Sequence, residues 1–243
     1  MPQRLILIDL ARSLALMCMV VFHFTLDLGM FGLIPPATAF TGFFWYFARL
    51  TAGSFLFLAG MGLWMSYSTA IRWPAFFRRL AKIVAAAALV SVVTWFAMPE
   101  FWIFYGILHS IAVSSLLGLL FLRMLAPVLL AVAALVFALP WFWSDPAFGG
   151  LLTWIGLSGQ VPLTADFEPV FPWFAPFLAG MAVARIFARF DIWRRISPPP
   201  SRLLNALAWP GRHSLAIYLI HQPLLIGMLA LLVWLTASSA AAP

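Results

Sequence analysis

Charged residues are scarce in this sequence. Only 9% of its 243 residues are charged, while 65% are hydrophobic; an average soluble protein carries about 25% charged residues. One globular core cannot hide so much apolar surface, so this scarcity excludes a soluble protein. The composition predicts an all-α fold, namely a polytopic integral membrane protein whose immediate partner is the lipid bilayer.

Cysteine is nearly absent, and recognised metal and phosphate motifs are missing. Cys18 is the single cysteine, which excludes an internal disulfide. The chain contains no zinc-type ligand spacing, no glycine-rich phosphate loop and no nucleophile elbow. We therefore expect no metal cofactor.

The sequence does contain many apolar segments long enough to cross a bilayer. The segment at 147–160 is too short to cross, so we expect it at the surface or re-entrant. Apart from these segments nothing resembles a soluble domain, so we expect a single transmembrane domain over residues 1–243. About seven segments qualify: 5–28, 45–70, 82–98, 103–122, 124–143, 170–189 and 213–236.

The basic residues indicate the orientation of these segments. The formal net charge is +7, which in a soluble protein would suggest nucleic acid. With a cytoplasmic N-terminus, however, twelve of the 14 basic residues fall on the cytoplasmic side, all except Arg12 and Arg49. This is the positive-inside pattern, so we expect no nucleic-acid partner and an outer C-terminus.

A short internal repeat occurs in two of the predicted helices. FLAGM stands at 57–61 and again at 177–181, in helices that the topology makes parallel. Its small residues allow two helices to approach closely. A duplicated transporter would repeat more, yet at the same offset Arg12 and His23 align with Val132 and Trp143. We interpret the repeat as helix packing.

Four ionisable residues interrupt the first apolar segment: Asp9, Arg12, His23 and Asp27. At about 100° per residue they share a sector about 60° wide and span about 27 Å of the helix axis. Cys18 lies about 180° from Asp9, which argues against Cys18 as a nucleophile. Charges in a bilayer are costly and usually face a protein interior or an aqueous cavity. The four residues therefore predict a polar path across the membrane.

The two ends of this path differ. Asp9 and Arg12 can pair near the cytoplasmic end, although an ion pair that only anchors the helix is an alternative. His23 and Asp27 can hydrogen-bond near the outer end, as a general base and the carboxylate that orients it. Alternatively, Asp27 is an ordinary loop acid and His23 a packing residue.

Several stretches together resemble a known family. Arg12 followed after ten residues by His23 resembles the first-helix signature of bacterial integral-membrane O-acyltransferases. RLILIDLARSLALMCMVVFHF at 4–24, FYGILHSIAVSSLLG at 104–118, DFEPVFPWFAPFLAGMA at 166–182 and GRHSLAIYLIHQPLL at 211–225 resemble bacterial relatives of the heparan-alpha-glucosaminide N-acetyltransferase catalytic domain.

This resemblance implies a multi-pass acyltransferase of the bacterial inner membrane. Its donor would be cytoplasmic acetyl-CoA, and its acceptor a sugar or glycan on the far side. Arg12 would meet the cofactor and His23 the acceptor. Arg12 or a neighbouring donor would also have a catalytic role, by steadying negative charge on the cofactor or on the tetrahedral intermediate. The animal enzyme has Asn where His23 stands and uses a His from the following loop. That loop contains no His here, so His23 would have to serve as the base.

Other polar residues are candidates for the same site. In the last apolar segment Ser214, Tyr218 and His221 share a helix face, and Pro223 is expected to kink the helix next to His221 and Gln222. Interhelical hydrogen bonding is the alternative role for these residues.

The remaining candidates are spread along the chain. Arg212 and His213, with Asp9, could hold the cofactor, although membrane anchoring explains Arg212 equally well. His109 either lines the site or bonds across helices. Asp166 either binds acceptor hydroxyls or amines or is a solvated loop acid. Arg49 is expected to pair with Asp27 or with substrate.

A different class of function also fits the polar path. In a small transporter or proton-coupled carrier, the path would conduct and His23 would relay protons. A scaffold subunit with degenerate chemistry is a third option. The sequence leaves a homodimer open.

Overall fold

The computed structural model describes residues 5–199 and 201–240. The described residues are 79% helical and form no strand beyond one isolated bridge between Tyr105 and Phe167. Five helices are long and apolar enough to cross a membrane. The all-α polytopic membrane fold predicted from the sequence is thereby confirmed.

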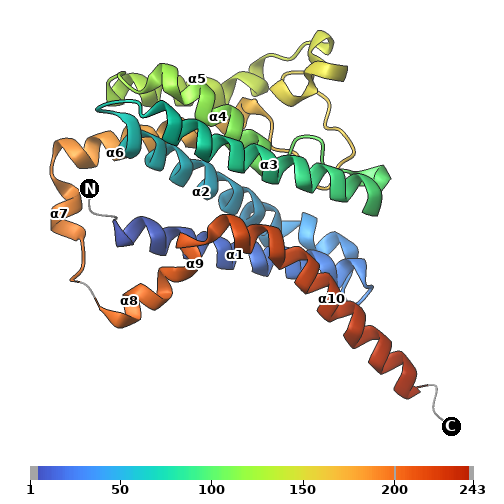
Figure 1. Cartoon of the computed structure of the whole chain (residues 1–243). Helices are drawn as coiled ribbons and strands as arrows, with labels where there is room; N and C mark the ends of the chain where they lie inside the picture. Colours follow the sequence, from blue (N-terminus) through green and yellow to red (C-terminus); the bar gives the residue numbers. More distant parts are fainter. Residues whose placement is uncertain (1–4, 200, 241–243) are drawn as a thin grey trace. The chain divides into compact units, whose positions relative to one another are not determined.

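Seven long helices correspond to the seven predicted segments (Figure 1). Two of them, α4 and α5, have 15 and 17 residues, or about 22 and 26 Å, and are short for a hydrocarbon core of about 30 Å. The bounds are α1 Ile6–Met30, α2 Gly42–Tyr67, α3 Trp73–Ala97, α4 Ile107–Phe121, α5 Ala126–Phe142, α6 Val170–Arg189 and α10 Ser214–Ala240.

The largest boundary error lies in the third segment. α3 begins at Trp73 rather than at 82, with Pro74 in its first turn, where proline's fixed φ is compatible with a helix. The basic residues Arg78, Arg79 and Lys82 therefore extend the helix before its apolar part rather than forming a loop.

Short helices fill the connections. The segment at 147–160 holds only 3₁₀ turns, and Leu151 there is 95% exposed, in agreement with a segment too short to span. The short elements are η1 Pro36–Phe40, η2 Pro99–Phe101, η3 Pro146–Phe148, η4 Gly150–Ile155, α7 Ile192–Ile196, α8 Arg202–Leu207 and α9 Trp209–Arg212.

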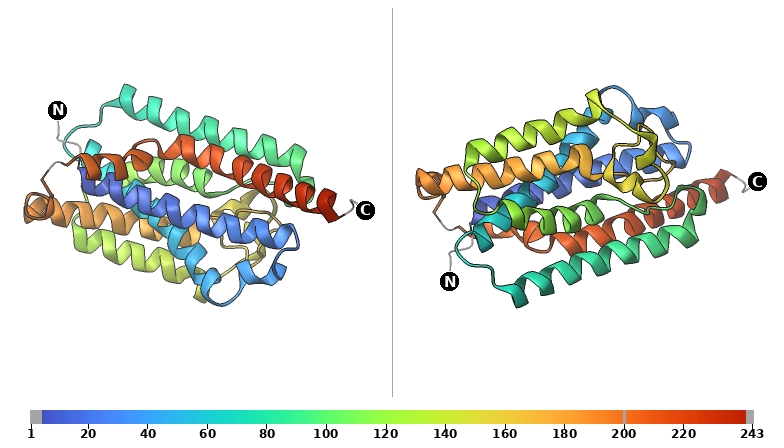
Figure 2. Two further views of the ribbon diagram at one scale, coloured as in Figure 1. Left: turned by 90° about the horizontal axis from the view of Figure 1, so that it is seen from below. Right: turned by 90° about the horizontal axis from the view of Figure 1, so that it is seen from above.

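The chain forms two compact units. The first contains the residues up to 52 and those from 198 onward; in it α1 packs against α9 and α10 (Figure 2). The second contains residues 53–197; in it α5 packs on α6, and α4 contacts α3 and α6. The boundary between the units at residue 52 falls inside α2, so one continuous helix belongs to both units. The single domain expected from the sequence stays a prediction.

The two FLAGM segments pack against each other within the second unit. A Cβ on Gly60 would overlap the carbonyl of Phe177, and a Cβ on Gly180 would overlap the carbonyl of Phe57. The two glycines therefore let α2 and α6, which run in the same direction (Figure 1), approach at backbone distance. The interpretation of the repeat as helix packing is confirmed.

Candidate active site

The polar face of α1 is turned inward. Asp9 is 1% and Asp27 0% exposed, whereas Leu14, Met17 and Val21, on another side of the helix, are about half exposed. Exposed apolar side chains suit contact with lipid, and buried carboxylates need polar partners. The stripe predicted from helical spacing is therefore a buried face of α1.

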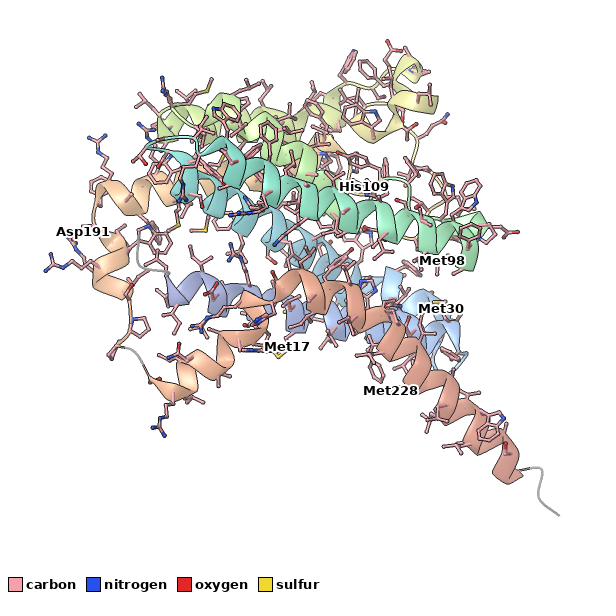
Figure 3. The ribbon with its side chains drawn as sticks, in the orientation of Figure 1. Met17, Met30, Met98, His109, Asp191 and Met228 are labelled. Atoms are coloured by element: carbon pink, nitrogen blue, oxygen red, sulfur yellow. The ribbon has the colours of Figure 1, made fainter. Side chains whose placement is uncertain are left out.

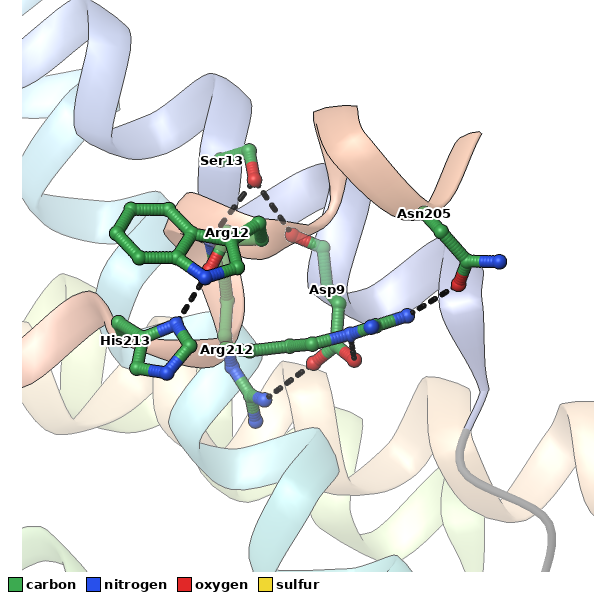
Figure 4. A network of polar contacts seen from close by, with 8 residues as sticks. Asp9, Arg12, Ser13, Asn205, Arg212 and His213 are labelled. Atoms are coloured by element: carbon green, nitrogen blue, oxygen red, sulfur yellow. Dashed lines mark hydrogen bonds and ion pairs between the residues drawn. The ribbon is translucent and has the colours of Figure 1, made fainter. Parts of the chain in front are cut away.

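Asp9 is the centre of an ion network near the N-terminal end of this face. Figure 4 shows its carboxylate accepting from Arg12 at 3.3 Å and from Arg212 of α9 at 3.4 Å. Arg212 also donates to Asn205 of α8 at 2.8 Å. The predicted pair between Asp9 and Arg12 is confirmed, and α9 contributes a second arginine to it. Two arginines thus share one carboxylate.

The hydroxyl of Ser13 holds α9 against α1 at the same level. Ser13 Oγ donates to the carbonyl of Asp9 at 3.1 Å and accepts from the Gly211 N–H at 2.8 Å. A side chain at Gly211 would overlap the Asp9 carbonyl, so only glycine allows this approach. His213, which follows, is exposed; its ring lies on Trp209 and its Nδ1 is 2.9 Å from the Trp209 carbonyl.

A second polar cluster joins α1 to α10. The rings of His23 and His221 meet edge to face, with centroids 4.9 Å apart. One residue further along α10, Gln222 Nε2 donates to Asp27 Oδ1 at 2.7 Å. Two consecutive residues of α10 thus contact the two polar residues of α1 that lie one turn apart.

The expected hydrogen bond between His23 and Asp27 is not formed in the described structure. Asp27 Oδ1 is taken by Gln222, and His23 Nδ1 has no partner there. The reason is tertiary: spacing on α1 alone could not show that α10 would supply a better-placed amide. Arg49 lies over the ring of Trp45, at 3.5 Å from its centroid, and donates to the Trp45 carbonyl at 3.3 Å; its pairing with Asp27 or with substrate stays a prediction.

The proton on His221 can be placed. Its Nδ1 lies 2.6 Å from the carbonyl oxygen of Tyr218, and a carbonyl only accepts, so Nδ1 donates. The opposite nitrogen, Nε2, then carries the lone pair of the neutral ring and can accept a proton. A hydrogen bond of this kind orients a ring and supports its positive charge after protonation.

Four buried atoms of this cluster lack a hydrogen-bond partner within the described part of the chain. They are His23 Nδ1, Asp27 Oδ2, His221 Nε2 and Gln222 Oε1. Buried polar atoms are almost always bonded, so a group of four unbonded ones needs a functional reason. Their placement within an apolar helix pair makes this cluster the candidate active site. Ser214, at the start of α10, lies about 10 Å along the axis from His221.

His109 has a structural role in the second unit (Figure 3). Its Nδ1 accepts from the Gly106 N–H at 3.2 Å, so Nε2 carries the proton and donates to Ser91 Oγ at 3.2 Å. Ser91 in turn donates to the Ile103 carbonyl at 2.6 Å. Nδ1 thus caps the start of α4, while Nε2 ties α4 to α3, as in the interhelical alternative.

Asp166 also acts on the start of α4. Its Oδ2 accepts from the Ile107 N–H at 2.8 Å, and Gly106 packs so closely on the carboxyl that a side chain there would overlap it. Burial raises the pKa of Asp166 to about 6, against the opposing effect of the Ile107 hydrogen bond. Asp166 therefore caps the first turn of α4, and its carboxyl is not open to an acceptor.

Five helices of membrane-spanning length in the described part of the chain define an integral membrane protein. The family of the heparan-alpha-glucosaminide N-acetyltransferase catalytic domain matches residues 4–223, nine-tenths of the sequence. The chain belongs to this family, and membership implies acyltransferase activity. No curated protein and no solved structure matches the chain significantly.

The sequence pointed to the members of the cluster but not to its pairing. His23, Asp27, His221 and Gln222 are all candidates from sequence, because ionisable and amide groups are rare in apolar segments. That His221 faces His23, and Gln222 faces Asp27, depends on the register between α1 and α10, which are nearly 200 residues apart. No local pattern carries that information.

Proposed function

We propose that this chain transfers an acetyl group from acetyl-CoA to a sugar or glycan hydroxyl or amine across a bacterial inner membrane. The observation that carries the proposal is the buried contact between His23 and His221 in a member of an N-acetyltransferase family. A histidine is the commonest general base, and here two lie side by side in an apolar helix pair.

His23 serves as the base that deprotonates the acceptor. As the acceptor oxygen or nitrogen attacks the thioester carbonyl, its proton passes to the imidazole. The tetrahedral intermediate then collapses, the carbon–sulfur bond breaks, and the thiolate leaving group takes up the proton. The acceptor is left with a new ester or amide bond. Transfer through an acetylated His23 is the two-step alternative.

His221 positions and assists His23. Its Nδ1 bond to the Tyr218 carbonyl leaves Nε2 as the acceptor, so it can receive a proton in the same centre. Asp27 adds negative charge one turn away, which favours an imidazolium, and Gln222 holds Asp27 in place through its amide.

Arg12 belongs at the cofactor end. It lies eleven residues from His23 on α1, or about 16 Å along the axis, which is too far to contact an intermediate at His23. With Arg212 and His213 it would meet the anionic part of the donor, while Asp9 orients both arginines. Arg49 and the cluster residues would contact the acceptor, whereas Ser214, next to His213, lies at the cofactor end.

The test measures acetyl transfer without assuming the acceptor. Purified chain in lipid nanodiscs is given acetyl-CoA labelled in the acetyl group, with a panel of amino sugars, neutral sugars and membrane glycan extract. We expect label on at least one sugar, together with stoichiometric release of the coenzyme A thiol. Nanodiscs with the His23→Ala variant serve as the matched control.

Two results would contradict the proposal. One is the absence of both thiol release and label transfer over the whole panel, with folded protein. The other is acetyl-CoA-independent uptake of a solute by vesicles containing the chain, which would favour the transporter class. If label reaches amines but not hydroxyls, the acceptor class is settled as amino sugar.

A further inference from the structure

An open pocket in the second unit is lined by three arginines. Its volume is about 560 Å³, within the range of small-molecule sites, and its walls include Trp64, Ser68, Arg123, Arg185 and Arg189. These residues come from the C-terminal ends of α2 and α6 and from the turn after α4. By the predicted topology all three ends face the cytoplasm.

The charge of these arginines is not balanced by acids. Within the described part of the chain, none of the three lies within ion-pair distance of a carboxylate: Arg185 donates to the Arg123 carbonyl at 3.5 Å, and Arg189 lies 5.9 Å from the ring of Phe190. The nearby acid Asp191 instead faces Arg194 at 4.0 Å. Anchoring to a membrane needs positive charge near the interface, but it does not need three arginines around one hollow.

The uncharged walls add hydrogen-bond donors. Ser68 and Thr69 contribute hydroxyls to the pocket lining, and Trp64 contributes apolar surface. Several donors with unmatched positive charge fit a group that only accepts and carries more than one negative charge. Arginine forks match the paired oxygens of phosphate.

We infer that this pocket binds the phosphate groups of an anionic ligand. Two sources have this chemistry on the cytoplasmic side: the nucleotide end of a coenzyme A thioester and the head group of an anionic phospholipid. The assignment of the ligand as a coenzyme A thioester rests on the proposed function, whereas the inference that the pocket binds phosphate does not. The basic residues at this end therefore act as a ligand site in addition to setting orientation.

The experiment compares two double variants of equal charge. Arg185→Gln with Arg189→Gln removes two pocket cations. Arg194→Gln with Arg195→Gln removes two cations from the neighbouring α7, whose side chains do not line the pocket. One arm titrates adenosine 3′,5′-bisphosphate and coenzyme A into each protein in neutral detergent. The other measures retention of phosphatidylglycerol and cardiolipin by native mass spectrometry.

We expect the pocket variant to lose about 10- to 100-fold in affinity for one of these ligands, and the α7 variant to lose less than threefold. Loss confined to the nucleotide arm identifies the coenzyme, and loss confined to the lipid arm identifies a head-group site. Arg185→Lys with Arg189→Lys should recover only part of the affinity. Equal binding by the pocket and α7 variants in both arms would overturn the inference. Because neither arm requires acetyl transfer, this failure is distinct from failure of the proposed function.

Discussion

At the scale of single residues, the decisive feature is a set of buried polar groups that the helices do not satisfy. In a bilayer-spanning helix each such group is costly, and four unbonded atoms gather around His23, Asp27, His221 and Gln222. By contrast, both nitrogens of His109 and the carboxyl of Asp166 are bonded within their own unit. The contrast separates the residues that we propose to act on substrate from residues that build the fold.

The hydrogen bond between Gln222 and Asp27 predicts a stability effect that depends on which partner is lost. Gln222→Leu leaves a buried carboxylate without its donor, so we expect a loss of about 1–3 kcal/mol, with the lower values typical of membrane proteins. The double variant Asp27→Leu with Gln222→Leu removes both polar groups and should be closer to wild type. Thermal unfolding in detergent measures both. Gln160→Leu, in an exposed loop, is the control. A double variant less stable than Gln222→Leu alone would contradict this view of the pair.

At the scale of elements, close helix approach depends on a few glycines. Gly60 and Gly180 let α2 and α6 meet at backbone distance, and Gly211 does the same for α9 on α1. The FLAGM echo made the first contact predictable from sequence. The second could not be predicted, because Gly211 lies in the short helix α9 and its need for glycine arises only from the Asp9 carbonyl opposite.

Gly60→Ala is expected to destabilise the second unit strongly. The new methyl group would overlap the Phe177 carbonyl, and backbone cannot yield as a flexible side chain can, so α2 and α6 must separate. Gly227→Ala in α10 is the matched control, since a Cβ there meets nothing within 4 Å and should stabilise the helix by about 0.5–1 kcal/mol. Detergent melting curves compare the two. The changes in stability of the two variants are expected to have opposite signs. A Gly60→Ala protein as stable as wild type would refute the close crossing of α2 and α6.

The start of α4 is expected to make stability depend on pH. The pKa of Asp166 is raised from 3.8 to about 6 in the folded chain by burial, so the folded state holds this proton more tightly than the unfolded state. Stability from this group is therefore complete below about pH 4 and is lost as pH rises toward 6 and beyond. Asp166→Asn keeps the oxygen that accepts from Ile107 but cannot titrate. When measured from pH 4 to 7, the melting temperature of the wild type should fall more steeply with rising pH than that of Asp166→Asn. Parallel curves would mean that Asp166 titrates normally.

At the scale of the whole molecule, most of the helices could be predicted from the sequence. Apolar length located all seven long helices, because the bilayer imposes length and composition locally. It failed at the start of α3, where amphipathic residues before the apolar core continue the helix. It also could not supply the pairing of α1 with α10, or the pocket formed by Arg123, Arg185 and Arg189. The positive-inside rule accounts for each of these arginines separately, so nothing in the sequence groups them into a pocket.

The orientation of the molecule is a prediction of the same rule. Twelve of 14 basic residues sort to one side when the N-terminus is cytoplasmic. A phosphatase that is active only outside the cytoplasm, fused after residue 243, should be active. A cytoplasmic reporter fused after Lys82 should be active as well. An inactive phosphatase at the C-terminus would require an even number of spans and would contradict the seven-helix topology.

The most direct measurement of the central claim is a double-mutant cycle on His23 and His221. Coenzyme A thiol release is followed for wild type, His23→Ala, His221→Ala and the double variant, with Cys18→Ser as the control. If the two rings form one centre, each single variant should lose about 10²–10⁴ in rate. The double variant should then lose little more than the worse single, because residues acting as a unit are not additive. Cys18→Ser should retain its rate. A near-wild-type rate for His23→Ala, or fully additive losses in the double variant, would contradict the account.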